Sequence, residues 1–101
     1  LLHSEKLTGV VLKDVNSGEA SQLELDGLFI SIGRDPATKL FQGQLELDGA
    51  GYIVADESTA TSLPGVFAVG DVRTKNVRQI VTAAADGAVA AHFAEQYLSE
   101  C

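Results

Sequence analysis

A carboxylate and the start of a helix are predicted to face the same point in this chain. The heptapeptide Gly-Val-Phe-Ala-Val-Gly-Asp is typical of a buried strand that ends on Gly70 and Asp71, and a helix rich in small residues opens seven residues later at Arg78, Gln79 and Ile80. Open α/β folds bind ligands at the carboxyl ends of their strands. The Asp71 carboxylate can accept hydrogen bonds from sugar-like hydroxyls, and the first N–H groups of the helix attract an electron-rich group. These five residues therefore predict half of a cofactor site.

The same residues also have interpretations that need no ligand. Asp commonly caps helices and turns, and Asp71 could do the same. Arg78 could be a solvated charge, but a cation at a helix start lies unfavourably in the helix dipole, which favours a ligand. Arg73 and Lys75 flank the loop and are expected to be solvated, and Tyr52 is expected to be a packing aromatic.

The first third of the chain has the pattern of strands. Residues 8–14 and 21–25 are separated by a Gly-containing turn, which predicts a β-hairpin. Residues 28–32 are nearly all apolar, as in a strand of a parallel sheet that is covered on both faces. Gly33–Pro36 breaks this pattern and is interpreted as a junction between two units.

The remainder predicts a short strand at 51–54, a buried strand at 66–69 and a helix over 77–100. The apolar positions of the helix recur at spacings of three and four: Ile80, Val81, Ala84, Ala88, Ala91, Phe93, Ala94, Tyr97 and Leu98. One helix cannot cover both faces of two buried strands, so the missing layers are expected to come from elsewhere.

The composition excludes several classes of function. The chain has 101 residues, 46% of them hydrophobic, and a net charge of -7, which argues against nucleic-acid binding. No apolar run approaches the roughly 20 residues of a membrane span, and no secretory signal opens the chain, so a cytoplasmic protein is expected. His3 and His92 have no metal-like partners, so no metal site is expected. Cys101 excludes an internal disulfide framework, and its sequence context assigns it no role.

Several segments together resemble the C-terminal third of a bacterial-type (low molecular weight) thioredoxin reductase, within the pyridine nucleotide-disulfide oxidoreductase superfamily. The resemblance spans essentially the whole chain, and its most specific part is the Arg-Gln pair before Thr-Ala-Ala. The segments that carry it are Asp26–Gly33 with Pro36, Phe41–Leu47, Gly51–Ile53, Thr61–Arg73, Arg78–Ala84 and Asp86-Gly87.

The resemblance implies part of an α/β, FAD/NAD(P)-binding Rossmann-like three-layer fold. Residues 1–33 would end the NADPH-binding domain, as a hairpin plus a strand, and residues 34–101 would be the C-terminal part of the FAD-binding domain. Asp71 would hold the FAD ribityl chain, and Arg78–Ile80 would lie against the isoalloxazine ring. The cofactors would be FAD and NADPH, and the parent enzyme would be a homodimer whose partner is thioredoxin.

Two signatures of that family do not occur in this sequence. It has no Gly-x-Gly-x-x-Gly after a strand and no Cys-x-x-Cys, the family's redox centre. With no Met and a start at Leu1, the chain is expected to be a fragment of such an enzyme, without catalytic residues and inactive alone. The alternatives are a non-catalytic α/β packing or dimerisation module, or a fragment of an alkyl hydroperoxide reductase flavoprotein subunit or a related ferredoxin–NADP reductase.

Overall fold

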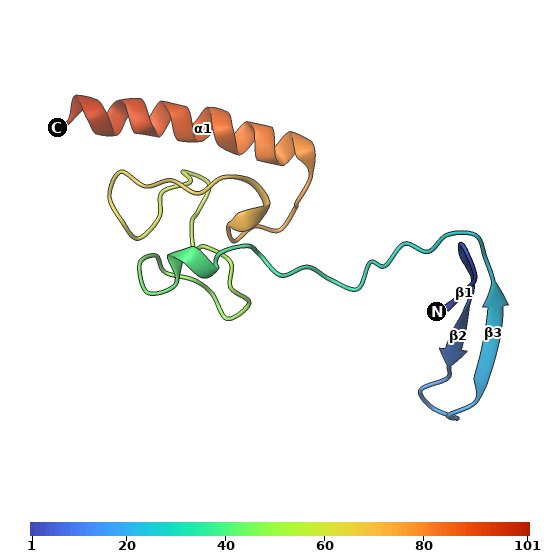
Figure 1. Ribbon diagram of the computed structural model, residues 1–101. Coiled ribbons are helices and arrows are strands. Elements are labelled where there is room, and N and C mark those ends of the chain that lie inside the picture. The colour runs from blue at the N-terminus through green and yellow to red at the C-terminus, as the bar shows by residue number, and fades with distance from the viewer. The chain divides into compact units, whose positions relative to one another are not determined.

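The computed structural model describes all 101 residues, which form two compact units, Leu1–Gly33 and Arg34–Cys101 (Figure 1). The boundary falls within the Gly33–Pro36 segment that the sequence marks as a junction. The assignment of the units to NADPH- and FAD-binding domains remains a prediction. No helix in the structure is long and apolar enough to cross a membrane.

The first unit is a three-stranded antiparallel sheet in the order β1-β2-β3. Its strands are β1 (Leu2–His3), β2 (Leu7–Lys13) and β3 (Ala20–Glu24). The β2–β3 pair confirms the predicted hairpin, with Val10 opposite Leu23. The Asp14 carboxylate stabilises its turn by accepting the backbone N–H groups of Asn16 and Ser17. Strand β1 was not predicted, because two residues carry too little pattern.

The predicted buried strand at 28–32 is wrong for this structure. The segment has no strand geometry, and Phe29 and Ile32 are 99% and 92% exposed. A strand of a parallel sheet obtains its hydrogen bonds from neighbouring strands, and no such neighbour exists in this chain. The apolar composition is therefore present without the sheet that would bury it.

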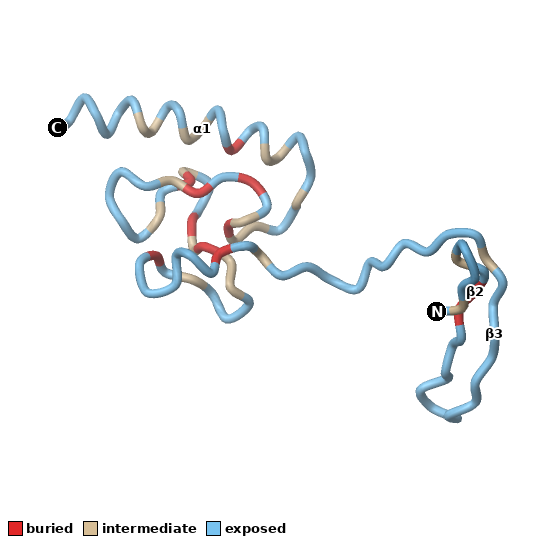
Figure 2. Tube along the Cα trace, in the orientation of Figure 1, coloured by how far each residue is buried: buried red, intermediate tan, exposed pale blue.

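The second unit has a small core surrounded by turns (Figure 2). Its buried hydrophobic residues are Leu45, Ile53, Ala55 and Ala68, with Leu47 and Val72 packed against them. The predicted strands at 51–54 and 66–69 are reduced to isolated bridges, in which Ile53 pairs with Leu47 and Arg73, and Phe67 pairs with Ala60. Val66 and Val69 are about 40% exposed rather than buried. As at 28–32, an extended segment without a full set of neighbouring strands does not form a ladder.

Two short 3-10 turns, η1 (Lys39–Phe41) and η2 (Gly70–Val72), precede the long helix α1 (Ile80–Ser99). The helix confirms the prediction but begins three residues later. Its first turn is closed by Thr82, whose hydroxyl accepts the Gln79 backbone N–H at 3.1 Å and donates to the Gln79 carbonyl at 2.9 Å.

The face of α1 that packs against its own unit is not the face formed by the apolar residues that the sequence pattern predicted. Ile80 and Val81 are 91% and 73% exposed, and the only buried residue of the helix is Asp86. Partly buried residues on either side of Asp86 continue the inner face at helical spacing: Thr82, Ala83, Val89, Ala90, Phe93 and Ala94. Helix α1 lies along the turns of its unit, in contact with η2 (Figure 1).

Candidate cofactor site

A cavity of about 730 Å³ lies where η2, the start of α1 and the first residues of the second unit meet. Four of the five predicted site residues line it: Asp71, Arg78, Gln79 and Ile80. Its other lining residues are Arg34, Asp35, Pro36, Ala37, Tyr52, Val72 and Ala83. The structure therefore brings together the carboxylate and the helix start that the sequence predicted to face one point.

Asp71 stands in the middle of η2 with its side chain exposed. Its carboxylate does not cap α1, because Thr82 closes that end of the helix. The carboxylate accepts no hydrogen bond from any protein group, although its backbone carbonyl accepts one from Arg78. A carboxylate at a cavity with free acceptor positions is able to bind hydroxyl groups of a ligand.

Gly70 does not line the cavity. It is buried, its φ of 75° lies in the left-handed region that glycine tolerates best, and its N–H donates to the Asp86 carboxylate at 2.9 Å. An added Cβ would stand 3.4 Å from the methyl group of Ala83. Gly70 therefore shapes the turn that presents Asp71.

Arg78 lies two residues before the first residue of α1 instead of within its first turn. Its guanidinium lies 3.9 Å from the centre of the Tyr52 ring. Its Nε donates to the Asp71 carbonyl at 3.3 Å, and an Nη donates to the Arg73 carbonyl at 3.1 Å. A cation over an aromatic face is attracted to it, so Tyr52 does more than pack.

Gln79 and Ile80 form the edge of the cavity at the start of α1. The Gln79 N–H donates to the Thr82 hydroxyl, and the Thr82 N–H donates to the Gln79 side chain. The N–H groups of Ile80 and Val81 precede the first intrahelical hydrogen bond, from the Ala83 N–H to the Gln79 carbonyl. This end of a 20-residue helix carries partial positive charge.

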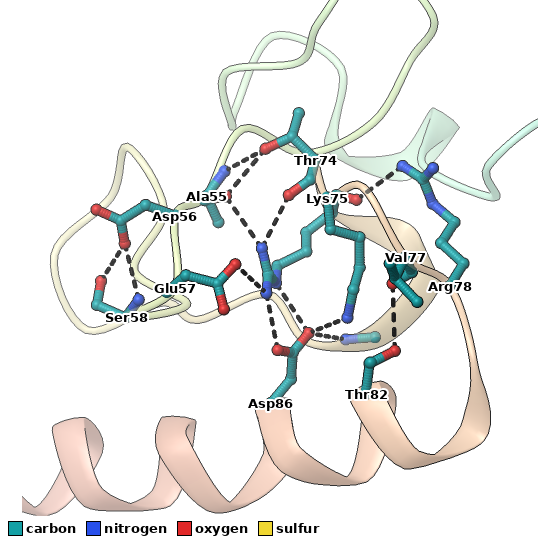
Figure 3. A network of polar contacts seen from close by, with 12 residues as sticks. Ala55, Asp56, Glu57, Ser58, Thr74, Lys75, Val77, Arg78, Thr82 and Asp86 are labelled. Atoms are coloured by element: carbon teal, nitrogen blue, oxygen red, sulfur yellow. Dashed lines mark hydrogen bonds and ion pairs between the residues drawn. The ribbon is translucent and has the colours of Figure 1, made fainter.

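Asp86, on helix α1, is the acceptor of a buried polar network (Figure 3). Arg73 donates Nε to one carboxylate oxygen and an Nη to the other, both at 2.8 Å. The Lys75 ammonium donates at 2.8 Å and the Gly70 N–H at 2.9 Å. Glu57, which is 92% exposed, adds an outer ion pair to Arg73 at 3.4 Å.

The prediction that Arg73 and Lys75 are solvated is wrong: their side chains are only 2% and 5% exposed. Hydrogen bonds from Arg73 hold the pKa of Asp86 far below its usual value; burial opposes this, and the bonds from Lys75 and Gly70 add to it. The Asp86 carboxylate in turn raises the pKa of Arg73. The carboxylate is therefore ionised, as a partner for two buried cations must be.

One signal in the sequence could have found this network. Asp is unfavourable inside a helix, because it competes for backbone hydrogen bonds. Asp86 nevertheless lies at helical spacing from Ala83, Ala90 and Phe93, on the inner face. A carboxylate at such a position needs a buried donor, and the cations nearest in sequence are Lys75 and Arg73.

The donor set at the cavity suits one kind of ligand. It combines a free carboxylate for hydroxyls, a cation and a helix start for an electron-rich edge, and apolar surface from residues such as Val72 and Ala83. No group of three or more acidic, His or Cys side chains that could hold a metal ion occurs in the structure. The donor set at the cavity can bind an organic ligand that has hydroxyls and an electron-rich edge.

Comparison with known proteins gives the family. The family model described as pyridine nucleotide-disulphide oxidoreductase matches residues 3–87. The chain belongs to this family.

Individual relatives agree on a narrower group. The chain is 53% identical over 100 residues to a thioredoxin reductase of Streptomyces clavuligerus, covering 97% of this chain and 31% of the relative. It is 50% identical over 95 residues to the mitochondrial thioredoxin reductase 1 of Arabidopsis thaliana, covering 93% of this chain and 25% of that protein. The chain thus spans less than a third of the relatives it matches.

Solved structures confirm the fold class. The crystal structure of Lactococcus lactis thioredoxin reductase superposes with a TM-score of 0.81 at 42% identity, covering 93% of this chain and 31% of that one. The T. acidophilum enzyme gives a TM-score of 0.77 at 42% identity, covering 92% of this chain and 30% of that one. The chain therefore has part of an α/β, Rossmann-like dinucleotide-binding fold.

Proposed function

We propose that this chain is the C-terminal portion of an NADPH-dependent flavoenzyme that reduces the disulfide of thioredoxin. Residues 1–33 would end its NADPH-binding domain, and residues 34–101 would close its FAD-binding domain. The observation that carries the proposal is the meeting of Asp71, Arg78 and the start of α1 at one cavity, in a chain whose relatives carry the name thioredoxin reductase.

FAD fits the residues at the cavity. Asp71 would accept hydrogen bonds from the ribityl hydroxyls, because its carboxylate is exposed and free of protein donors. The free N–H groups of Ile80 and Val81 would face the electron-rich edge of the ring system. Gln79 lies beside them, and Gly70 would act through the backbone turn that carries Asp71.

Bound FAD would supply the redox chemistry, taking hydride from NADPH and passing the electron pair to a disulfide. The residues of this chain would bind FAD and set the electrostatic environment of its ring system. The Arg78 guanidinium, held over Tyr52, and the helix start favour negative charge at the ring edge, which the helix stabilises by about 0.3–2 kcal/mol. No residue of this chain is proposed to exchange protons or electrons with the substrate.

The remaining features of the proposal concern the whole enzyme. It would use NADPH, act on thioredoxin, form a homodimer and work in the cytoplasm. The 101 residues alone would be inactive, because the Cys-x-x-Cys and glycine fingerprints expected of the family would lie in the other two thirds of the protein. High identity over nearly the whole chain supports this reading over a separate packing module.

The test uses the complete protein that contains this chain. Purified with FAD, it is expected to oxidise NADPH over many turnovers only when oxidised thioredoxin is present as the electron acceptor, and the 101-residue chain is expected to give no turnover under the same conditions. Transfer of electrons to a peroxide-reducing partner or to ferredoxin instead of thioredoxin would contradict the proposed substrate. Absence of bound flavin from the complete protein would contradict the cofactor assignment.

A further inference from the structure

Asp86 links helix α1 to the turn that carries Asp71. It is the only buried residue of α1, and two of its donors belong to the segment that carries Asp71. Gly70, one residue before Asp71, donates its backbone N–H at 2.9 Å. Arg73, two residues after Asp71, donates two N–H groups at 2.8 Å. The carboxylate therefore binds the turn on both sides of Asp71.

The turn depends on this support because its own closure is weak. The hydrogen bond from the Arg73 N–H to the Gly70 carbonyl is 3.4 Å long, longer than any of the four that Asp86 accepts. A backbone bond from Ile53 to the Val72 carbonyl ties the turn to the small core, but it does not reach the helix. The polar link between the turn and α1 runs through Asp86.

The same network reaches the second predicted site residue. An Nη of Arg78 donates to the Arg73 carbonyl, and its Nε donates to the Asp71 carbonyl. Arg78 is therefore bonded to the backbone of residues 71–73, the same segment that Asp86 binds through Gly70 and Arg73. Asp71 and Arg78 have a common support.

We propose that Asp86 is a positioning residue of the cofactor site, holding η2 against helix α1 so that the Asp71 carboxylate and the Arg78 guanidinium stand correctly at the cavity. This inference rests on the proposed function. Asp86 itself does not line the cavity, so it acts through Asp71 and Arg78.

The test is a double-mutant cycle on FAD affinity in the complete protein. Apoprotein is titrated with FAD, and the dissociation constant of the folded fraction is measured for wild type, Asp86→Asn, Asp71→Ala and the double variant. Asp86→Asn is expected to weaken FAD binding about 10- to 100-fold, because it misplaces the charge-assisted hydrogen bond of Asp71, and the absorption spectrum of the bound flavin should shift. In the Asp71→Ala background, Asp86→Asn should raise the dissociation constant of FAD much less, because the Asp71 carboxylate through which it acts is already absent. Glu95→Gln, at an exposed carboxylate of the same helix, is the control and should change nothing.

A role in stability alone gives a different result. Folded Asp86→Asn would then bind FAD within twofold of wild type, or its effect would multiply fully with that of Asp71→Ala; either outcome overturns the inference. If Asp86→Asn does not fold, Arg73→Lys serves instead, since it keeps the charge but loses the two-point contact. It should weaken FAD binding in the wild-type background and not in Asp71→Ala. Unchanged affinity of Asp71→Ala itself would instead overturn the proposed function.

Discussion

The carboxylate of Asp86 and the guanidinium of Arg73 form a two-point ion pair, with both hydrogen bonds 2.8 Å long and both side chains almost fully buried. Paired donors and acceptors of this kind are among the strongest polar contacts in proteins. The pair joins the middle of a helix to the turn that carries Asp71. The candidate site is therefore held by a polar contact where many small domains would use apolar packing.

Removal of this charge is expected to destabilise the protein. Asp86→Asn removes the buried counter-charge of two buried cations, Arg73 and Lys75, and leaves only the exposed Glu57 beside Arg73. Breaking a buried pair in this way costs about 3–5 kcal/mol. Urea unfolding of the complete protein at pH 7 measures the loss. Glu57→Gln removes only the exposed partner of Arg73 and should cost about 1 kcal/mol or less. Equal losses in the two variants would contradict the buried role of Asp86.

The cost of Asp86→Asn should also depend on pH. The folded state lowers the pKa of Asp86, so its ionised form stabilises the fold. This stabilisation is complete above the unfolded pKa, about 3.9, and is lost as the pH falls towards the lower folded pKa. The difference in stability between wild type and Asp86→Asn should therefore be constant from pH 7 to about 5 and shrink below about 4. A difference that grows on acidification would contradict this assignment.

Two glycines should respond to alanine in opposite ways. Gly70 has a φ of 75°, where a side chain costs about 1–2 kcal/mol, so Gly70→Ala should lower the free energy of unfolding. Gly87 is exposed inside α1 with nothing near its Cβ position, so Gly87→Ala should raise it by about 0.5–1 kcal/mol. Thermal unfolding of the two variants measures these opposite changes in stability. Stabilisation by Gly70→Ala would contradict the left-handed conformation of Gly70.

Features with a local cause were predictable from the sequence. The hairpin of β2 and β3 follows from alternation and a turn, and helix α1 follows from spacing and small residues. The later start of α1 reflects Thr82, whose hydroxyl closes the helix at Gln79. The meeting of Asp71 with the helix start was also predictable, because it depends on a short connection of a few residues.

Features that depend on distant partners were not predictable. Residues 28–32 have strand composition, but a strand needs hydrogen-bonded neighbours, and no other segment of this structure pairs with them. Arg73 and Lys75 are typical surface residues by type, and only the fold brings Asp86 to them. The contact of Arg78 with Tyr52, 26 residues earlier, likewise has no local pattern.

The exposed apolar segment of the first unit should make the isolated chain self-associate. Phe29 and Ile32 are almost fully exposed, and unpaired extended segments of this kind associate with other chains. Light scattering of the 101-residue chain at micromolar concentration should show species larger than a monomer. Replacement of Phe29 and Ile32 by Ser should reduce the fraction of these larger species. A compact monomer of the unmodified chain would contradict the expectation.

Arg78 should affect the rate of flavin reduction more than flavin binding. Arg78→Ala removes a charge beside the cavity while Asp71 remains, so FAD should stay bound. A charged interaction is worth about 1.5–3 kcal/mol, or about 10- to 150-fold in rate. Stopped-flow bleaching of the flavin by NADPH measures the rate in the complete protein. Arg78→Lys keeps the charge and should recover part of the lost rate. An unchanged rate of flavin reduction in Arg78→Ala would exclude a role of the Arg78 charge in this step.

The FAD affinity of Asp71→Ala tests the assignment of the site most directly. The substitution removes a charge-assisted hydrogen bond worth about 1.5–3 kcal/mol, so the dissociation constant of FAD should rise about 10- to 150-fold in the complete protein. Glu95→Ala, at an exposed carboxylate of the same unit, should leave it unchanged. If Asp71→Ala binds FAD with wild-type affinity, Asp71 is a turn residue and the cavity at the start of α1 is not the flavin site.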